Sequence, residues 1–159
     1  MTSSSSQARD DCARLFTVNF APAAEVMIGE VVEVRYQGVL FSVANQPLKP
    51  VDPSKYWVRF SMRGVMSRQS AFIMNDNPGP SPQEYDTNGL IFVQVFAPMS
   101  EVNGFAQGGL LAELAQAIFR GAETPSGVFF RNVRINELED DTKSFRWNVI
   151  AEYEFSEIG

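Results

Sequence analysis

The stretch from 89 to 120 constrains the fold of this chain more than any other, because it joins a strand to a helix through a short link. Residues 90–96 (LIFVQVF) are apolar except at Gln94, which is the pattern of a strand in the interior of a sheet. Pro98 follows and favours the end of the strand, because proline cannot donate a ladder hydrogen bond. We therefore predict an interior strand over 90–96.

The second half of this stretch predicts an amphipathic helix over 103–120. Asn103 is a favourable N-cap residue, and Gly121 stands where a glycine commonly ends a helix. The predicted apolar stripe consists of Leu111, Leu114, Ala115 and Ile118. The residues expected to face away from it are Glu113, Gln116 and Arg120.

Two further segments alternate between apolar and polar side chains, as half-buried strands do. In 145–155 the apolar positions are Phe145, Trp147, Val149, Ala151, Tyr153 and Phe155. In 56–63 one face consists of Tyr56, Val58, Phe60 and Met62, and the other of Trp57, Arg59, Ser61 and Arg63. We expect helices to cover the first face of 56–63, and solvent or a neighbouring subunit to meet the second.

The N-terminal region predicts a second helix. Residues 1–6 are rich in serine, and we expect them to form a flexible lead. Apolar positions at helical spacing then predict an amphipathic helix over 5–20, ended by Pro22. The predicted buried stripe consists of Ala8, Cys12, Leu15, Phe16 and Asn19.

Shorter signals predict the remaining strands and loops. Residues 32–36 alternate, and Gln37-Gly38 suits a turn into 39–43, so a small hairpin is expected there. Strands are also predicted at 68–74 and 128–135. A polar loop with three prolines is predicted at 75–88, and an acidic hairpin loop at 136–143.

These elements predict an α+β fold formed by a single domain over 7–159. Its sheet is expected to be mixed but rich in antiparallel pairs, with two amphipathic helices packed on one face. The chain has 159 residues, a length that suffices to bury a sizeable core.

Composition argues against several classes of function. The net charge of −6 disfavours gripping nucleic acid, which needs clustered cations to neutralise phosphates. The chain has no histidine, so the commonest general base and metal ligand is missing. Cys12 is the single cysteine and forms no disulfide within the chain. With no secretory pattern at the N-terminus and no long apolar segment, we expect the chain to stay in the cytoplasm where it is made.

Two groups of carboxylates are candidates for chemical sites. The first comprises Glu137, Glu139, Asp140 and Asp141, and the second Asp76, Glu84 and Asp86. The first group lacks the spacing of an EF-hand, and a proline-rich loop supports a preorganised acid–base site poorly. The glycines at 104, 108 and 109 form no phosphate-binding motif and are interpreted as packing residues. We therefore predict no catalytic residue, no metal site and no cofactor.

Arginine and tryptophan on one strand face predict a protein interface instead. Trp57, Arg59 and Arg63 lie on the outward face of 56–63, and Arg68 follows on the next predicted strand. Such residues are enriched in interfaces, and ion pairs with acidic loops of a neighbouring subunit would use them. We predict that Trp57, Arg59, Arg63 and Arg68, with Asp76, Glu84 and Asp86, contact another subunit or a tube.

The order of these segments resembles the tail terminator family of long-tailed bacteriophages. The similarity covers roughly residues 5–155. It is carried by the N-terminal amphipathic helix, the approach Asn45…Pro50…Tyr56-Trp57-Val58-Arg59, the run 89–98 (GLIFVQVFAP), the helix with 114–119 (LAQAIF) and the two closing strands.

The resemblance implies a virion protein of the phage tail. It implies a homohexameric ring that caps the tail tube protein, stops its polymerisation and presents a surface to the connector or neck proteins of the head. DNA would pass through the ring without sequence-specific binding, and no membrane is involved. Glu137, Glu139, Asp140 and Asp141 are predicted to line the lumen or face the tube.

Three alternatives remain from the sequence. Another neck or tail completion protein would share this size, acidity and α+β character. A small oligomeric ligand-binding or enzymatic domain would instead use a pocket between helices and sheet. A cytoplasmic adaptor would bind a peptide along an exposed strand edge.

Overall fold

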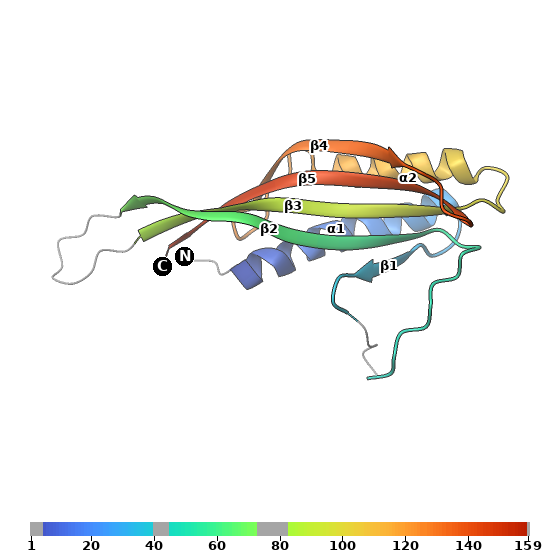
Figure 1. Ribbon diagram of the computed structural model, residues 1–159, viewed down its shortest axis with the longest axis horizontal. Helices are drawn as coiled ribbons and strands as arrows, with labels where there is room; N and C mark the ends of the chain where they lie inside the picture. Colours follow the sequence, from blue (N-terminus) through green and yellow to red (C-terminus); the bar gives the residue numbers. More distant parts are fainter. Residues whose placement is uncertain (1–4, 40–44, 73–82, 159) are drawn as a thin grey trace.

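The computed structural model describes residues 5–39, 45–72 and 83–158. It consists of one sheet of five strands in the order β1-β2-β3-β5-β4. The strands are β1 (Glu33–Tyr36), β2 (Trp57–Phe72), β3 (Gln83–Pro98), β4 (Phe129–Leu138) and β5 (Ser144–Ile158). Strand β1 pairs with β2 in parallel, and every other pair is antiparallel. The predicted mixed, antiparallel-rich sheet is therefore confirmed (Figure 1).

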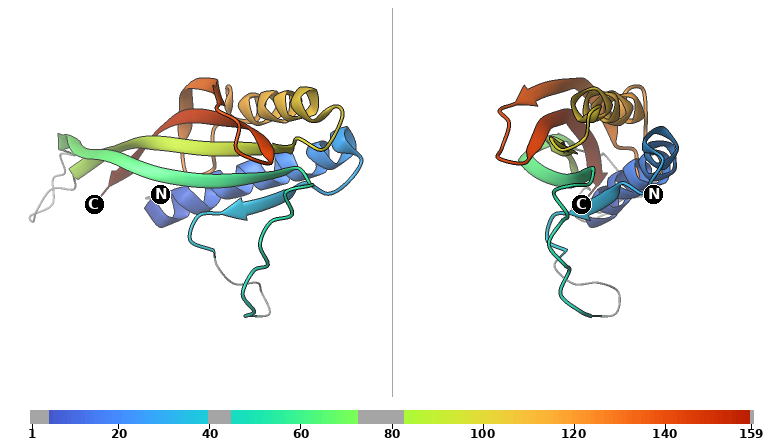
Figure 2. Two further views of the ribbon diagram at one scale, coloured as in Figure 1. Left: turned by 45° about the vertical axis from the view of Figure 1, so that its right-hand side comes forward. Right: turned by 90° about the vertical axis from the view of Figure 1, so that its right-hand side faces the viewer.

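Two helices, α1 (Ser5–Ile28) and α2 (Gly104–Phe119), pack on the same face of this sheet. Figure 2 shows both helices on one side of the strands and the opposite side bare. The Phe16 ring of α1 lies 5.5 Å from that of Phe60 on β2 and 6.0 Å from that of Phe119 on α2. One cluster of buried side chains thus joins the two helices to the sheet. The predicted α+β class is correct.

The inward faces of the central strands follow the predicted alternation. Val58, Val95 and Trp147 are opposite one another across β2, β3 and β5 and are buried. The other buried side chains of these three strands include Phe60, Met62, Ile91, Val93, Val149, Ala151, Tyr153 and Phe155, and Tyr56 immediately before β2 is buried too. Period-two alternation therefore predicted this half of the core.

Helix α1 is longer than predicted. Pro22 lies inside the helix, which ends at Ile28. Gly29 follows with a φ of 89°, and its amide donates to the Glu25 carbonyl at 2.8 Å. The fully buried residues of α1 recur every fourth position: Ala8, Cys12, Phe16, Phe20 and Ala24. Burial of Ala24, beyond the proline, explains why packing keeps the helix continuous. Asn19, which was predicted to be in the stripe, is exposed and donates to the Leu15 carbonyl.

The predicted strand at 68–74 and loop at 75–88 also need correction. Strand β2 runs without a break to Phe72, and β3 already begins at Gln83. Between Gln83 and Asn88 the β3 backbone pairs with both β2 and β5, so this polar segment is part of the sheet. The ladder is formed by main-chain groups, which explains why polar side chains do not prevent it. Residues 73–82 lie outside the described part of the chain.

The other predicted elements differ in detail. Strand β1 joins the sheet through β2, whereas the predicted hairpin partner at 39–43 falls mostly on residues 40–44, which are not described. Strand β4 continues to Leu138, and only 139–143 forms the turn into β5. In α2, Gln116 does not face away, because its side-chain amide donates to the Val133 carbonyl at 3.1 Å.

Two of the three glycines of α2 are packing residues, as predicted. A Cβ at Gly104 would collide with the Pro98 carbonyl, and a Cβ at Gly108 with the Trp147 ring. Gly109 has open space around it. The absence of side chains at 104 and 108 therefore lets α2 lie directly on β3 and β5.

Candidate functional site

The bare face of the sheet is the first candidate site. Strand register places its side chains in rows that cross β2, β3, β5 and β4. The first row is Trp57, Phe96, Arg146 and Leu138; the next two are Arg59, Gln94, Asn148 and Asn136, and Ser61, Phe92, Ile150 and Arg134. We call this surface the bare face. It mixes apolar and charged side chains, as the cores and rims of protein interfaces do.

The apolar part of the bare face centres on aromatic rings. Trp57 and Phe96 stack with centroids 4.0 Å apart and planes 4° from parallel. Trp57, Phe92 and Phe96 remain only half-buried because neither helix covers this side. The chain thus keeps apolar area partly in water, and a partner on this face would bury it.

Three of the seven predicted interface residues lie on the bare face. Trp57 is half-buried, whereas Arg59 and Arg63 are exposed. Within the described part of the chain, neither arginine forms an ion pair. Both guanidinium groups are therefore available to a partner.

The other four predicted interface residues lie elsewhere or are not described. Arg68 is directly opposite Asp86 in the β2–β3 ladder, and Glu84 is opposite Ala71. Asp86 is half-buried and accepts a hydrogen bond from the Ser156 hydroxyl at 2.7 Å. Asp76 lies outside the described residues.

The four predicted loop carboxylates do not form one loop. Glu137 belongs to β4 and is opposite Trp147, so it lies on the helix side of the sheet edge. Glu139 and Asp140 are exposed in the turn between β4 and β5. The Glu139 carbonyl accepts from Arg146 Nε and Nη2 at 3.0 and 2.8 Å, which ties the turn to the bare face.

Asp141 has a structural role in this turn. Its Oδ1 accepts from the backbone amides of Lys143 and Ser144 at 2.8 and 2.6 Å. The hydrogen bond from the Lys143 amide, followed by that from Ser144, lowers the pKa of this carboxyl below its ordinary value. Asp141 therefore shapes the turn that presents Glu139 and Asp140.

A basic groove, which was not predicted from the sequence, lies at the edge of the sheet formed by β1. Its cations are Arg35 of β1, Lys49 of the segment before β2, and Arg59 of β2, with Trp57 beside them. The groove encloses about 410 Å³. Arg35 is directly opposite Arg59 because β1 pairs in parallel with β2. The sequence predicts β1 as half of a local hairpin, and that prediction does not bring Arg35 and Arg59 together.

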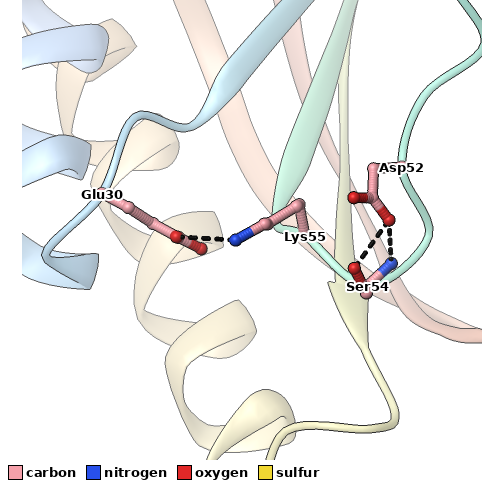
Figure 3. Close-up of polar contacts among 4 residues, drawn as sticks. All are labelled: Glu30, Asp52, Ser54 and Lys55. Carbon is pink, nitrogen blue, oxygen red and sulfur yellow. Dashed lines mark hydrogen bonds and ion pairs between the residues drawn. The ribbon is translucent and has the colours of Figure 1, made fainter.

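Polar contacts of Arg35 and of the segment before β2 hold the wall of the basic groove in place. Arg35 Nη2 donates to the Lys49 carbonyl at 2.5 Å, and Arg35 Nε lies 2.7 Å from Glu33 Oε1 in an ion pair. Figure 3 shows the next part of this segment, where Lys55 Nζ pairs with Glu30 Oε2 at 3.0 Å. The hydrogen bond and charge of Glu30 raise the pKa of Lys55, which stays cationic.

Asp52 shapes the same segment. Its Oδ1 accepts from the amide and hydroxyl of Ser54 at 2.9 and 2.6 Å, which lowers the pKa of the carboxyl (Figure 3). The Lys55 amide also donates to the Asp52 carbonyl at 3.1 Å. This local turn delivers the chain from the wall of the basic groove into β2.

A charged cleft of about 580 Å³ lies at the other end of the sheet, beside an irregularity in β4. The ladder shifts between Arg131 and Arg134, and Asn132 has a φ of 51°. Arg131 pairs with Glu154, and Arg134 Nη1 lies 3.3 Å from Glu152 Oε2. The charges that line this cleft are therefore largely matched within the chain.

Other groups among the described residues bear on metal binding, thiol chemistry and membrane insertion. No three His, Cys, Asp or Glu side chains in 5–39, 45–72 and 83–158 are placed to hold a metal ion. Burial, followed by the charge of Asp11, raises the pKa of the Cys12 thiol to about 12, so it is protonated at neutral pH. Among the same residues, neither helix has the length and apolar content needed to cross a membrane.

Comparisons with known proteins show the fold alone. No family model matches the sequence, and the search of curated proteins finds no match. The fold is similar to solved structures, one of which has a name that states no function. That structure is 15% identical, has a TM-score of 0.56, and aligns with 92% of this chain and 94% of its own. The arrangement of helices and strands is therefore shared across most of both chains.

Proposed function

We propose that this chain is a phage tail terminator that forms a hexameric ring on the end of the tail tube. The ring stops polymerisation of the tube protein and presents a joining surface to the head-side connector or neck proteins. The protein is made in the host cytoplasm and resides in the virion tail. The observation that carries the proposal is the bare face, which has aromatic and arginine side chains and no helix over it.

Physical chemistry supports an assembly role for this face. Each half-buried ring of Trp57, Phe92 and Phe96 leaves apolar area in water, and burial stabilises by about 25 cal/mol per Å² of such area. Arg59 and Arg63 add charged contacts that can select a partner. A subunit of a ring needs such surfaces toward its neighbours or toward the tube.

The sequence resemblance supports the same proposal. Its segments fall in α1, in the approach to β2, and in β2, β3, α2, β4 and β5. The overall charge of −6 suits a ring through which DNA passes, because an acidic lumen does not retain phosphates.

Purified components test this proposal directly. Tube protein is polymerised with and without the chain, and tube lengths and the position of the gold-labelled chain are recorded by negative-stain microscopy. We expect the chain at one tube end and shorter tubes as its concentration rises. Tubes of unchanged length with no bound chain would contradict the proposal.

A matched pair of variants tests whether the bare face is involved. Phe92→Ala removes a half-buried ring from that face, whereas Val26→Ala removes an exposed side chain from α1. We expect capping to require at least tenfold more of the Phe92 variant and an unchanged amount of the Val26 variant. Equal capping by the two variants would contradict a role of the bare face in capping.

A further inference from the structure

The basic groove lacks an acidic lining residue. Lys49 and Arg59 line it and form no ion pair within the described part of the chain, while Arg35 is held by Glu33. The chain has 13 basic and 19 acidic residues, so three cations around one groove stand out against an acidic background. Such a groove suits an anionic occupant that also offers apolar contact to Trp57.

The turn between β4 and β5 is a matching acidic surface. We call Glu139 and Asp140 the acidic turn; both are exposed, and neither forms an ion pair within the described residues. Asp141 and Arg146 hold the backbone of this turn through four hydrogen bonds. A turn that is already ordered loses little conformational entropy on binding.

The two surfaces lie on opposite edges of the sheet but at the same end. β1 and β4 are the outermost strands, so the basic groove belongs to one edge and the acidic turn to the other. Trp57, Phe96, Arg146 and Leu138 share one row across the sheet. Trp57 flanks the basic groove, and Leu138 immediately precedes the acidic turn. The two surfaces therefore lie at a similar position along the strands.

We infer that the acidic turn of one copy of this chain docks in the basic groove of the next copy. Complementary surfaces at different edges give a head-to-tail contact, which closes into a ring or continues as a filament. Because both surfaces lie at one end of the sheet, this contact shifts successive copies little along the strand direction. A small shift favours a closed ring over a helical filament. This contact rests on the proposed ring and specifies which residues join its subunits.

Cysteine cross-linking tests the contact. The variant with both Lys49→Cys and Asp140→Cys is treated with a short bismaleimide, as the purified chain and on isolated tails. We expect a ladder of covalent species reaching the size of the ring. Each single variant alone should give no link, and a mixture of the two singles should stop at dimers. Native Cys12 is buried, so the unaltered chain serves as the unreactive control.

Charge exchange provides an independent test. The groove variant K49E/R59E and the turn variant E139K/D140K should each lose at least tenfold in tube capping, and their combination should regain most of it. Controls of equal charge change are R14E/R120E and E25K/E113K, which alter exposed residues away from both surfaces. Unfolding midpoints of all variants are compared with that of the native chain.

The outcomes separate this contact from the proposed function. Absence of a ladder from the double-cysteine variant, or linking by Lys49→Cys alone, would overturn the head-to-tail contact even if the chain caps tubes. Binding of duplex DNA by the native chain that the groove variant loses and the added turn variant does not restore would assign the groove to nucleic acid and overturn the contact too. A full ladder with uncapped tubes would leave the contact and refute the terminator function.

Discussion

At the scale of single residues, close packing between α2 and the sheet depends on Gly108. Because this glycine lies against the Trp147 ring and Ala97, the helix backbone contacts β3 and β5 directly. The same helix carries Gly109 one residue later, on a side with open space. Two adjacent glycines therefore occupy opposite packing environments, which makes them a matched pair for experiment.

We predict opposite effects of alanine at these two glycines. A Cβ at Gly108 would lie 2.7 Å from the Ala97 Cβ, so Gly108→Ala should lower the free energy of unfolding by about 1–3 kcal/mol. Gly109→Ala meets nothing within 4 Å and should raise it by up to about 1 kcal/mol through helix propensity. Urea denaturation measures both values, and a stabilising Gly108 variant would contradict this packing.

We also predict a pH-dependent contribution from Asp141. Its pKa is lowered in the folded protein, so its stabilisation is present above the ordinary value of 3.8 and is lost as the pH falls through the folded pKa. Asp141→Ala should cost about 0.5 kcal/mol at pH 7, because exposed hydrogen bonds contribute little. The difference from the native chain should shrink in urea titrations at pH 3. An undiminished difference there would count against the carboxylate as the cause.

At the scale of elements, α1 shows packing overriding a local signal. Pro22 lacks the amide that would bond to the Val18 carbonyl, and its ring crowds the preceding turn. The helix nevertheless continues, because Phe20 and Ala24 on either side are fully buried. The helix ends instead at Ile28 and is followed by Gly29, whose φ of 89° suits glycine.

The cost of this proline should be measurable. Pro22 is exposed, so Pro22→Ala restores an amide without opening a cavity. We expect the free energy of unfolding to rise by about 1–3 kcal/mol, the range for an interior helix proline. Thermal and urea unfolding provide the measurement. A loss of stability would show that the chain depends on a bend at Pro22.

The elements that the sequence predicted well are those with strong local patterns. The alternation from Tyr56 and from Phe145, and the stripe of α2, follow from burial on one face and require no knowledge of partners. The parallel pairing of β1 with β2 places Arg35 opposite Arg59, although the two residues are far apart in the sequence. A local sequence pattern does not predict such a pairing. The basic groove was missed for that reason.

At the scale of the whole molecule, the two faces of the sheet differ in how far their side chains are buried. The helix-covered face contains the buried core, whereas the bare face leaves aromatic rings half-buried. Sequence alternation predicted this division but not its boundary, since the polar start of β3 is part of the sheet. The candidate interface residues Trp57, Arg59 and Arg63 do share the bare face, while Glu137 is separated from the turn.

This division predicts unequal effects on stability. Phe119 is fully buried, so Phe119→Ala should lower the free energy of unfolding by about 3–5 kcal/mol. Phe92 is only half-buried, and Phe92→Ala should cost the isolated chain less than half as much. Urea denaturation of both variants gives the comparison. Equal losses would place Phe92 in the core and weaken the case for an assembly face.

Tail length in particles that lack this chain tests the central claim most directly. The gene is removed from the phage in which the proposed function places it, and tails are measured by negative-stain microscopy with the gene restored as control. The account predicts overlong tubes of variable length without attached heads. Tails of normal length that fail to join heads would contradict it and assign the chain to the neck, and normal infectious particles would refute a structural role.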